Sequence, residues 1–269
     1  MIRLVKKVVN SRPQLKAAIQ RSAIFQPLIN WVNPPVYDHD GMRLYGKSTD
    51  FLQDDRFIHA YWAGMDSGHK IGRREGSRDD IHIEWRVHIA IWAACHATHL
   101  DGDFVECGVN TGILSLAICN YIDFNATGKS FYLFDTFRGI PEEQMLDSER
   151  PYRTGENESY YDECFEKTRL NFEPFYRAQL VRGRVPDTLN TVPIEKVSYL
   201  HIDMNIVVPE IAAIEFFWDK LVGGAVVLLD DYGWSNYSEQ KKAMDAFASR
   251  KGIAIATLPT GQGLLIKPR

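Results

Sequence analysis

No apolar run in the sequence reaches the ~18 residues that a membrane-spanning helix requires, and no signal-peptide pattern opens the chain. The four cysteines show no C-x-x-C spacing, and three lie among apolar residues, so we expect reduced core side chains and not disulfides or metal ligands. The net charge is only −4, which gives no overall field to recruit nucleic acid. These absences predict a cytoplasmic protein without an integral membrane span and without a nucleic-acid partner.

Acidic residues are missing from positions 1–37, which carry six lysines and arginines among apolar residues. A basic segment of this kind can lie on an acidic membrane surface. Pro13 interrupts the helix, however, so an arm that is solvated or that contacts another subunit is favoured. We expect residues 1–75 to form a basic arm and a helical extension, acting as a lid or as the contact of a homo-oligomer. The main domain is then expected at 76–269.

The main domain is organised around Asp101–Leu116, which is typical of a short buried strand, a sharp turn and the start of a helix. Gly108 and Gly112 let the turn take positive φ and let the backbone approach a ligand, and N–H groups of the following helix point into the same crevice. In an α/β chain, such a segment holds a nucleotide-like cofactor. A lone Gly-x-x-x-Gly turn is equally consistent with an ordinary strand–helix connection.

Further apolar runs follow at the intervals of βαβ units, and they are continuous enough for strands buried on both faces of a parallel sheet. These predicted strands are Ser130–Asp135, Ala178–Arg182, Ser198–Asp203 and Ala225–Asp230. Helices are expected at Asn110–Ile122, Ser159–Asn171, Val208–Leu221 and Ser238–Arg250. The acidic segment Pro141–Glu158 is long for a connection and predicts a lid or a mobile insert. The chain ends in two short strands joined by a tight hairpin, so the last strand is antiparallel.

Carboxylates stand at the ends of these strands, where ligands bind in parallel α/β sheets. Asp135 ends the second strand and can accept both hydroxyls of a ribose, or it can cap a helix. Asp203 and the pair Asp230 and Asp231 end two neighbouring strands. Three like charges in one crevice repel one another unless a cation neutralises them, and oxygen-only ligation favours Mg²⁺. The other interpretation is that one or two of these aspartates cap helices.

Five motifs occur together and in a fixed order: Asp-Phe-Val-Glu-Cys-Gly-Val, Phe-Asp-Thr-Phe-Arg-Gly-Ile-Pro, Arg-Gly-Arg-Val-Pro-Asp-Thr-Leu, His-Ile-Asp and Leu-Leu-Asp-Asp-Tyr-Gly. With them, the segment from about Thr49 to Lys267 resembles the macrocin-type sugar O-methyltransferases, a branch of the class I S-adenosylmethionine-dependent methyltransferases. The resemblance implies a Rossmann-like α/β domain. Its sheet is expected to be mostly parallel and seven-stranded, with an antiparallel C-terminal strand.

The resemblance also implies roles for individual residues. The cofactor-contacting positions of the family match Glu106, Gly108, Asn110, Asp135 and Gly183, and its Mg²⁺ ligands match Asp203, Asp230 and Asp231. The metal would chelate two adjacent sugar hydroxyls and lower the pKa of the one that is methylated. Transfer of the methyl group in line from sulfonium to oxygen would then depend largely on positioning.

One departure from the family pattern concerns the general base. The family usually reads Asp-x-Asp-Leu-Tyr after the fourth strand, and here Asn205 replaces the second Asp. A neutral amide cannot take up a proton, although its carbonyl can orient a substrate. His201 lies on the same side of its strand as Asp203 by the period-two alternation and is the candidate catalytic replacement. A buried, hydrogen-bonded histidine is the alternative interpretation of His201.

We therefore expect a Mg²⁺-assisted, S-adenosylmethionine-dependent O-methyltransferase whose partner is a small polyol or glycoside. One alternative is a methyltransferase-like protein that binds the cofactor without turnover, an interpretation supported by Asn205. Another is a nicotinamide-dependent oxidoreductase. The carboxylate cluster and the terminal hairpin oppose it, because a nicotinamide-binding domain usually ends in another parallel strand.

Overall fold

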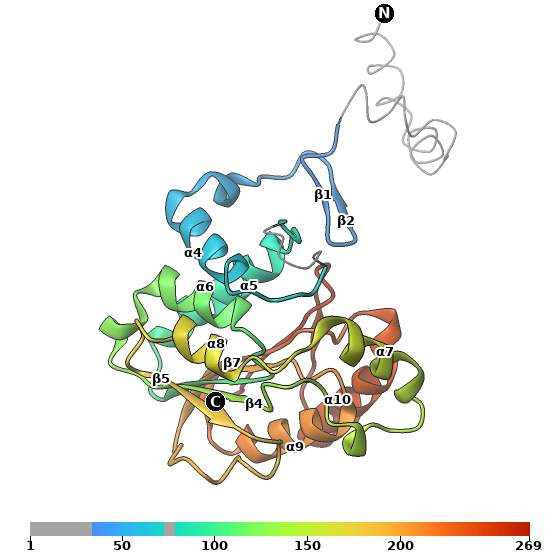
Figure 1. Cartoon of the computed structure of the whole chain (residues 1–269). Coiled ribbons are helices and arrows are strands. Elements are labelled where there is room, and N and C mark those ends of the chain that lie inside the picture. Colours follow the sequence, from blue (N-terminus) through green and yellow to red (C-terminus); the bar gives the residue numbers. More distant parts are fainter. Residues whose placement is uncertain (1–33, 73–78) are drawn as a thin grey trace, which may run out of the picture. The chain divides into compact units, whose positions relative to one another are not determined.

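A computed structural model describes residues 34–72 and 79–269, and the chain divides into two compact units with a boundary after Asp50. The predicted basic arm lies almost wholly outside the described residues. In its described part, the first unit contains an antiparallel hairpin of β1 (Tyr37–His39) and β2 (Met42–Leu44) (Figure 1). Within the two described ranges, no helix is long and apolar enough to cross a membrane.

The second unit is built on a seven-stranded sheet with the order β5-β4-β3-β6-β7-β9-β8. Its strands are β3 (Asp103–Cys107), β4 (Phe131–Asp135), β5 (Ala178–Arg182), β6 (Val197–Ile202), β7 (Leu221–Leu229), β8 (Ala256–Thr257) and β9 (Gly263–Ile266). Strands β3 to β7 are parallel, and β9 runs antiparallel to β7 and to β8. The predicted fold, a mostly parallel seven-stranded sheet with an antiparallel end, is therefore confirmed.

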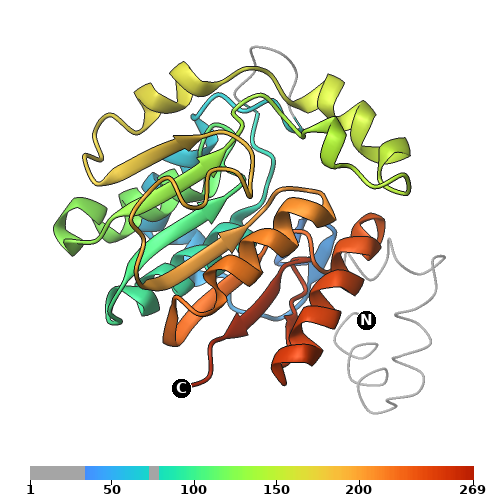
Figure 2. The same ribbon diagram turned by 90° about the horizontal axis from the view of Figure 1, so that it is seen from below.

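Helices cover both faces of this sheet, as Figures 1 and 2 show. The α-helices of the unit are α4 (Asp55–Met65), α5 (Glu84–Thr98), α6 (Ile113–Ile122), α7 (Arg150–Tyr160), α8 (Phe165–Asn171), α9 (Val207–Trp218) and α10 (Ser238–Lys251). Short 3₁₀ turns are η1 (Asp50–Gln53), η2 (Phe124–Thr127), η3 (Glu142–Gln144) and η4 (Ser235–Tyr237). Helices α4, α5 and α6 pack on one face and α9 and α10 on the other. Alternate strand residues separate the two cores: Phe104 and Tyr199 face the first, whereas Val105 and Leu200 face the second.

The segment before α8 differs from the prediction. One helix was expected at Ser159–Asn171, but the chain forms α7 and α8 with a short break between them, and α7 occupies half of the predicted lid segment. Helix α7 has no apolar stripe, because Arg153 is its only buried residue, and so no periodic pattern in the sequence indicated it.

Gly108 is required by the packing of two strand ends. Its φ is +92°, and a Cβ atom there would lie 1.8 Å from the carbonyl oxygen of Asp203. At Gly112, a Cβ atom would lie 2.5 Å from the ring of Phe172. The glycines thus have the positive φ that the sequence predicted, and protein atoms occupy the position that a side chain would take at each.

We predict that Gly108→Ala lowers the free energy of unfolding by about 3 kcal/mol or more, because backbone must move on both sides of the new methyl group. Gly128 is the matched control, since its φ is +74° and nothing lies within 4 Å of its Cβ position. Gly128→Ala should cost only the left-handed backbone penalty of about 1–2 kcal/mol. Urea unfolding measures the free energy of unfolding of both variants. Equal losses of stability in Gly108→Ala and Gly128→Ala would show that the Asp203 carbonyl does not constrain the turn.

Candidate functional site

The strand register lines up the residues that the sequence singled out. The last paired residues of β4, β3, β6 and β7 lie level with one another. The residues that follow them therefore line one edge of the sheet: Asp135, Gly108, Asp203 and Asp230. This is the carboxyl edge, where ligands bind in parallel α/β sheets.

Asp230 is a buried carboxylate that its neighbours neutralise. Its Oδ2 accepts a hydrogen bond from Arg86 (2.9 Å), and its Oδ1 accepts one from Nε2 of Gln262 (3.0 Å). Burial alone would raise the pKa of Asp230, but the charge of Arg86 and the attraction of His201 hold it below its usual range. Asp230 is therefore ionised and fixed in orientation from the α5 face of the sheet.

His201 joins two carboxylates inside the protein. Its Nδ1 lies 2.8 Å from Oε1 of Glu106, its Nε2 lies 3.8 Å from Oδ1 of Asp230, and its side chain is fully buried. Burial alone would lower the pKa of His201, but attraction to Asp230 and Glu106 outweighs it and raises this pKa to about 10. An imidazole that is already protonated at neutral pH cannot take up another proton. The two carboxylates beside His201 therefore favour its protonated form.

Asp203 and Asp231 are half-buried aspartates whose anions are compensated less fully than that of Asp230. Burial raises the pKa of Asp203 well above its usual range, and repulsion from Asp230 and Asp231 raises it further. Burial and repulsion from Asp230 likewise raise the pKa of Asp231, to about 7, although Arg86 lies 4.0 Å from it. Two such carboxylates fit a bound divalent cation. Among the described residues, however, ligand atoms from Asp203, Asp230 and Asp231 do not all lie within 4.8 Å of one another.

Asp135 holds the glycine turn. Its Oδ2 accepts the backbone N–H groups of Val109 (2.6 Å) and Asn110 (2.7 Å), and its Oδ1 accepts that of Phe137 (2.6 Å). The carboxylate expected to bind a ribose is thus used largely by the protein's own backbone. The turn after β5 is attached at the same place, because the N–H of Gly183 donates to the Asp135 carbonyl (2.8 Å).

Two polar atoms beside the turn are buried and have no hydrogen-bond partner among the described residues. They are Oε2 of Glu106, an acceptor, and Nδ2 of Asn110, a donor. Buried polar groups rarely stay unpaired, so these atoms indicate a ligand with complementary groups. The ammonium and carboxylate of an amino-acid moiety, as in S-adenosylmethionine, fit this pair.

Sequence reasoning missed Arg86, although the sequence contains a signal for it. Arg86 lies on the same face of α5 as Ala90, Ala93 and Ala97, which are fully buried. An arginine in line with buried alanines requires a buried anion as its partner, here Asp230. Gln262 also reaches the site, from the predicted C-terminal hairpin. Arg153, Tyr161 and Tyr237 reach it as well, from segments that have no recognisable pattern.

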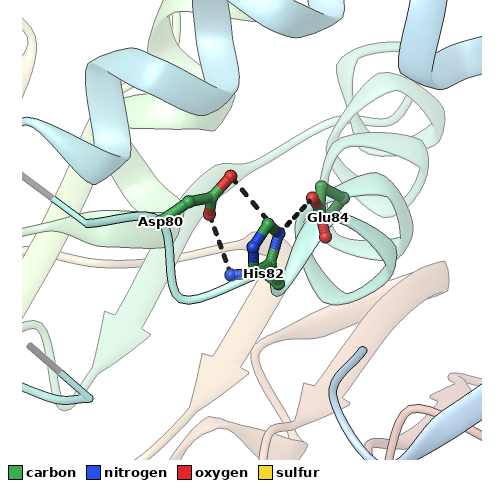
Figure 3. A group of neighbouring side chains, drawn as sticks. All are labelled: Asp80, His82 and Glu84. Atoms are coloured by element: carbon green, nitrogen blue, oxygen red, sulfur yellow. Dashed lines mark hydrogen bonds and ion pairs between the residues drawn. The ribbon is translucent and has the colours of Figure 1, made fainter. Parts of the chain in front are cut away.

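A second polar group lies at the start of α5 (Figure 3). His82 stands between two carboxylates, with Nδ1 3.2 Å from Glu84 and 3.5 Å from Asp80. Their ligand atoms are close enough to hold a metal ion. However, the imidazole itself lies between the carboxylates, and Asp80 also accepts the hydroxyl of Tyr61 and the N–H of His82. These contacts fix the start of the helix that carries Arg86, and we assign no metal to them.

We predict that His201→Gln destabilises the metal-free protein by about 3–5 kcal/mol near pH 6, because two buried carboxylates lose their cation. The folded-state pKa of about 10 lies above the unfolded value of about 6.5. The contribution of His201 is therefore complete below pH 6.5 and is lost as the pH rises towards 10. Urea unfolding in chelator measures the free energy of unfolding of the original protein and of His201→Gln. The gap between these two free energies should narrow as the pH rises from 6.5 towards 10. A gap of constant size would contradict a protonated His201.

Comparison with solved structures shows the fold. The O-methyltransferase NovP is 19% identical, with a TM-score of 0.65 over 80% of this chain and 100% of that chain. The calicheamicin methyltransferase CalS11 is 16% identical, with a TM-score of 0.56 over 82% and 93% of the two chains. Cofactor-bound Rv0187 from MTB is 14% identical, with a TM-score of 0.51 over 81% and 93%. No curated protein matches the chain.

The family follows from the sequence model of macrocin O-methyltransferase, TylF, which matches residues 87–258. This match covers β3 to β8 and therefore all the strand ends that form the site. The chain belongs to the macrocin O-methyltransferase family, and with its class I fold it is an S-adenosylmethionine-dependent O-methyltransferase.

Proposed function

We propose that the protein transfers a methyl group from S-adenosylmethionine to a hydroxyl of a sugar or another polyol, with Mg²⁺ beside the acceptor. The observation that carries this proposal is the pair of half-buried aspartates Asp203 and Asp231, which stand beside Asp230 on neighbouring strand ends and whose pKa values are raised by burial and by repulsion from neighbouring carboxylates. They follow the ends of β6 and β7, on the edge that also bears the glycine turn. A sugar acceptor is supported by the family, which is named for macrocin.

Glu106 and Asn110 are proposed to hold the amino-acid end of the cofactor. The free Oε2 of Glu106 would accept from the ammonium group, and the free Nδ2 of Asn110 would donate to the carboxylate. Gly108, Asp135 and Gly183 would act indirectly, because their contacts shape the turn between the strand ends.

Asp203, Asp230 and Asp231 would hold the metal ion. When bound, S-adenosylmethionine supplies the methyl group, and Mg²⁺ supplies positive charge that favours ionisation of the acceptor hydroxyl. Arg86 and Gln262 orient Asp230, and His201 links Asp230 to Glu106. The metal side and the cofactor side of the site are thus connected through one buried imidazole, which we propose is a positioning residue.

The two alternatives are less well supported. A nicotinamide-dependent oxidoreductase does not agree with the family or with the antiparallel end of the sheet. A cofactor-binding protein without turnover has Asn205 in its favour. Mass spectrometry separates it from an enzyme, since a panel of sugars, sugar nucleotides and glycosides incubated with S-adenosylmethionine should yield one product heavier by a methyl group.

We predict that S-adenosylhomocysteine, and not NAD, raises the melting temperature. At one hundred times its dissociation constant it adds about 2.7 kcal/mol, or about 5–10 °C for a unit of this size. Asp135→Asn should weaken the shift and also lower the stability of the cofactor-free protein by about 2 kcal/mol, because an amide cannot accept from N–H groups on both sides. Normal cofactor-free stability with a lost shift would instead assign Asp135 to the ribose.

We also predict that chelator lowers methyl transfer by more than about 100-fold while leaving the S-adenosylhomocysteine shift nearly unchanged, because the metal serves the acceptor. Asp203→Asn should have the same effect at saturating cofactor. Asp187→Asn is the control, because Asp187 is an exposed aspartate whose ion-pair partner among the described residues is Arg184. Activity that is insensitive to chelator would overturn the metal assignment.

A further inference from the structure

The insert, defined here as residues 141–161, contains η3 and the helix α7 that Figure 1 labels. It makes polar contacts with the candidate site. We propose that Asn205 is a positioning residue that fastens this insert across the acceptor side of the site, and that it is not a vacated base position. This proposal rests on the proposed function in one respect, because it assumes that the methyl acceptor binds beside Asp203 and Asp231.

The backbone fixes Asn205 before its side chain makes any contact. Its φ is +65°, a left-handed conformation that asparagine adopts more readily than most residues. Its N–H donates to Oε1 of Glu210 (3.0 Å), and so does the N–H of Met204 (3.2 Å). Glu210 is buried on α9, so the turn after β6 is attached to the helix that follows it.

The side-chain amide of Asn205 then joins two tyrosines from different segments. Nδ2 donates to the hydroxyl of Tyr161 (3.3 Å), and Oδ1 accepts from the hydroxyl of Tyr237 (3.0 Å). Tyr161 ends the insert, and Tyr237 lies in η4, in the segment that follows Asp231. One amide therefore ties the insert to the loops that carry Asp203 and Asp231.

Arg153 makes a second tie at the same place. It is 1% exposed, and its guanidinium lies 3.6 Å from the centre of the Tyr237 ring. It donates to the carbonyl of Asn236 (3.1 Å) and to both carboxylate oxygens of Glu156 (2.6 Å each). Arg153 of the insert thus contacts the ring of Tyr237, and Asn205 accepts a hydrogen bond from its hydroxyl.

The other side of the insert is anchored independently of Asn205. The side chain of Asn157 exchanges two hydrogen bonds of 2.7 Å with the backbone of Ile140, just after β4. Glu149 accepts the N–H of Val207 (2.8 Å) at the start of α9. The insert therefore spans from the β4 side of the edge, near the cofactor residues, to the β6 and β7 side.

Apolar packing under the insert is small. It consists of a cluster of Ile140, Met145 and Ile206, against which Tyr161 packs. Local opening free energies are low where few apolar groups are buried, so the polar ties decide how often the insert opens.

A neutral amide suits this tie, and a carboxylate does not. Asparagine offers one donor for Tyr161 and one acceptor for Tyr237, whereas aspartate has no donor. An aspartate would also place a further negative charge near Asp203 and Asp231, where the protein provides too little positive charge already. Asn205→Asp should therefore loosen the insert, and it should not accelerate methyl transfer.

Closure of such an insert excludes water and completes the contacts around an acceptor. Loss of the tie should raise KM for the acceptor and lower kcat together, while the dissociation constant of S-adenosylhomocysteine changes little.

Hydrogen exchange of the backbone amides of residues 150–160 tests the tie directly, in full-length protein without acceptor. Loss of one or two hydrogen bonds should speed exchange by about 5- to 30-fold in Asn205→Ala, Asn205→Asp and Tyr161→Phe, with β3 to β7 unchanged. Tyr152→Phe is the control, because Tyr152 lies on α7 and is 60% exposed. Asn157→Ala removes the two hydrogen bonds to Ile140 and shows how much faster these amides exchange when the insert loses that anchor.

Unchanged exchange in all three test variants, with faster exchange in Asn157→Ala, would overturn the proposal. A faster Asn205→Asp enzyme would overturn it as well, since that result would restore the base interpretation. The exchange result does not depend on methyl transfer. If the insert responds as expected and no polyol is methylated, the tie stands and the proposed function fails.

Discussion

Negative charge at the carboxyl ends of β6 and β7 is the constraint on which the rest of the site depends. The parallel register brings Asp203 and Asp230 onto neighbouring strand ends, and Asp231 follows directly. Arg86, Gln262 and His201 converge on Asp230, whereas Arg86 and Arg153 offset the charge of Asp231 only in part. Asp203 and Asp231 are half-buried, and burial together with repulsion from neighbouring carboxylates raises their pKa values, a repulsion that a cation would relieve. The neutral Asn205 beside them is consistent with the same constraint.

Much of the fold could be predicted from the sequence because its strands are continuous apolar runs. Each predicted parallel strand is present within a few residues, and Ala178–Arg182 has the predicted bounds. The antiparallel end followed from the hairpin, whose turn is local in the chain. Helix α7 could not be predicted, because Arg153 is its one buried residue and polar contacts with distant segments hold it in place. Such contacts leave no periodicity in the sequence.

The site was predictable where position along a strand determines it and not where distant side chains converge. Strand ends gave Asp135, Asp203 and Asp230, because parallel strands place their carboxyl ends at one edge. The same reasoning placed His201 on the side of Asp203, but it could not show the carboxylates on both sides of the imidazole, which raise its pKa. The backbone use of Asp135 was equally invisible, since Val109 and Phe137 meet it only after the turn has formed.

Anomalous scattering from Mn²⁺-soaked crystals tests the central claim most directly. We expect one strong peak in contact with the carboxylates of Asp203 and Asp231, because a cation would relieve the repulsion that raises their pKa values. The same map examines the group of Asp80, His82 and Glu84, whose ligand atoms already lie close together. A peak there with none at Asp203 would contradict the account, and so would a map without any peak at the ends of β6 and β7.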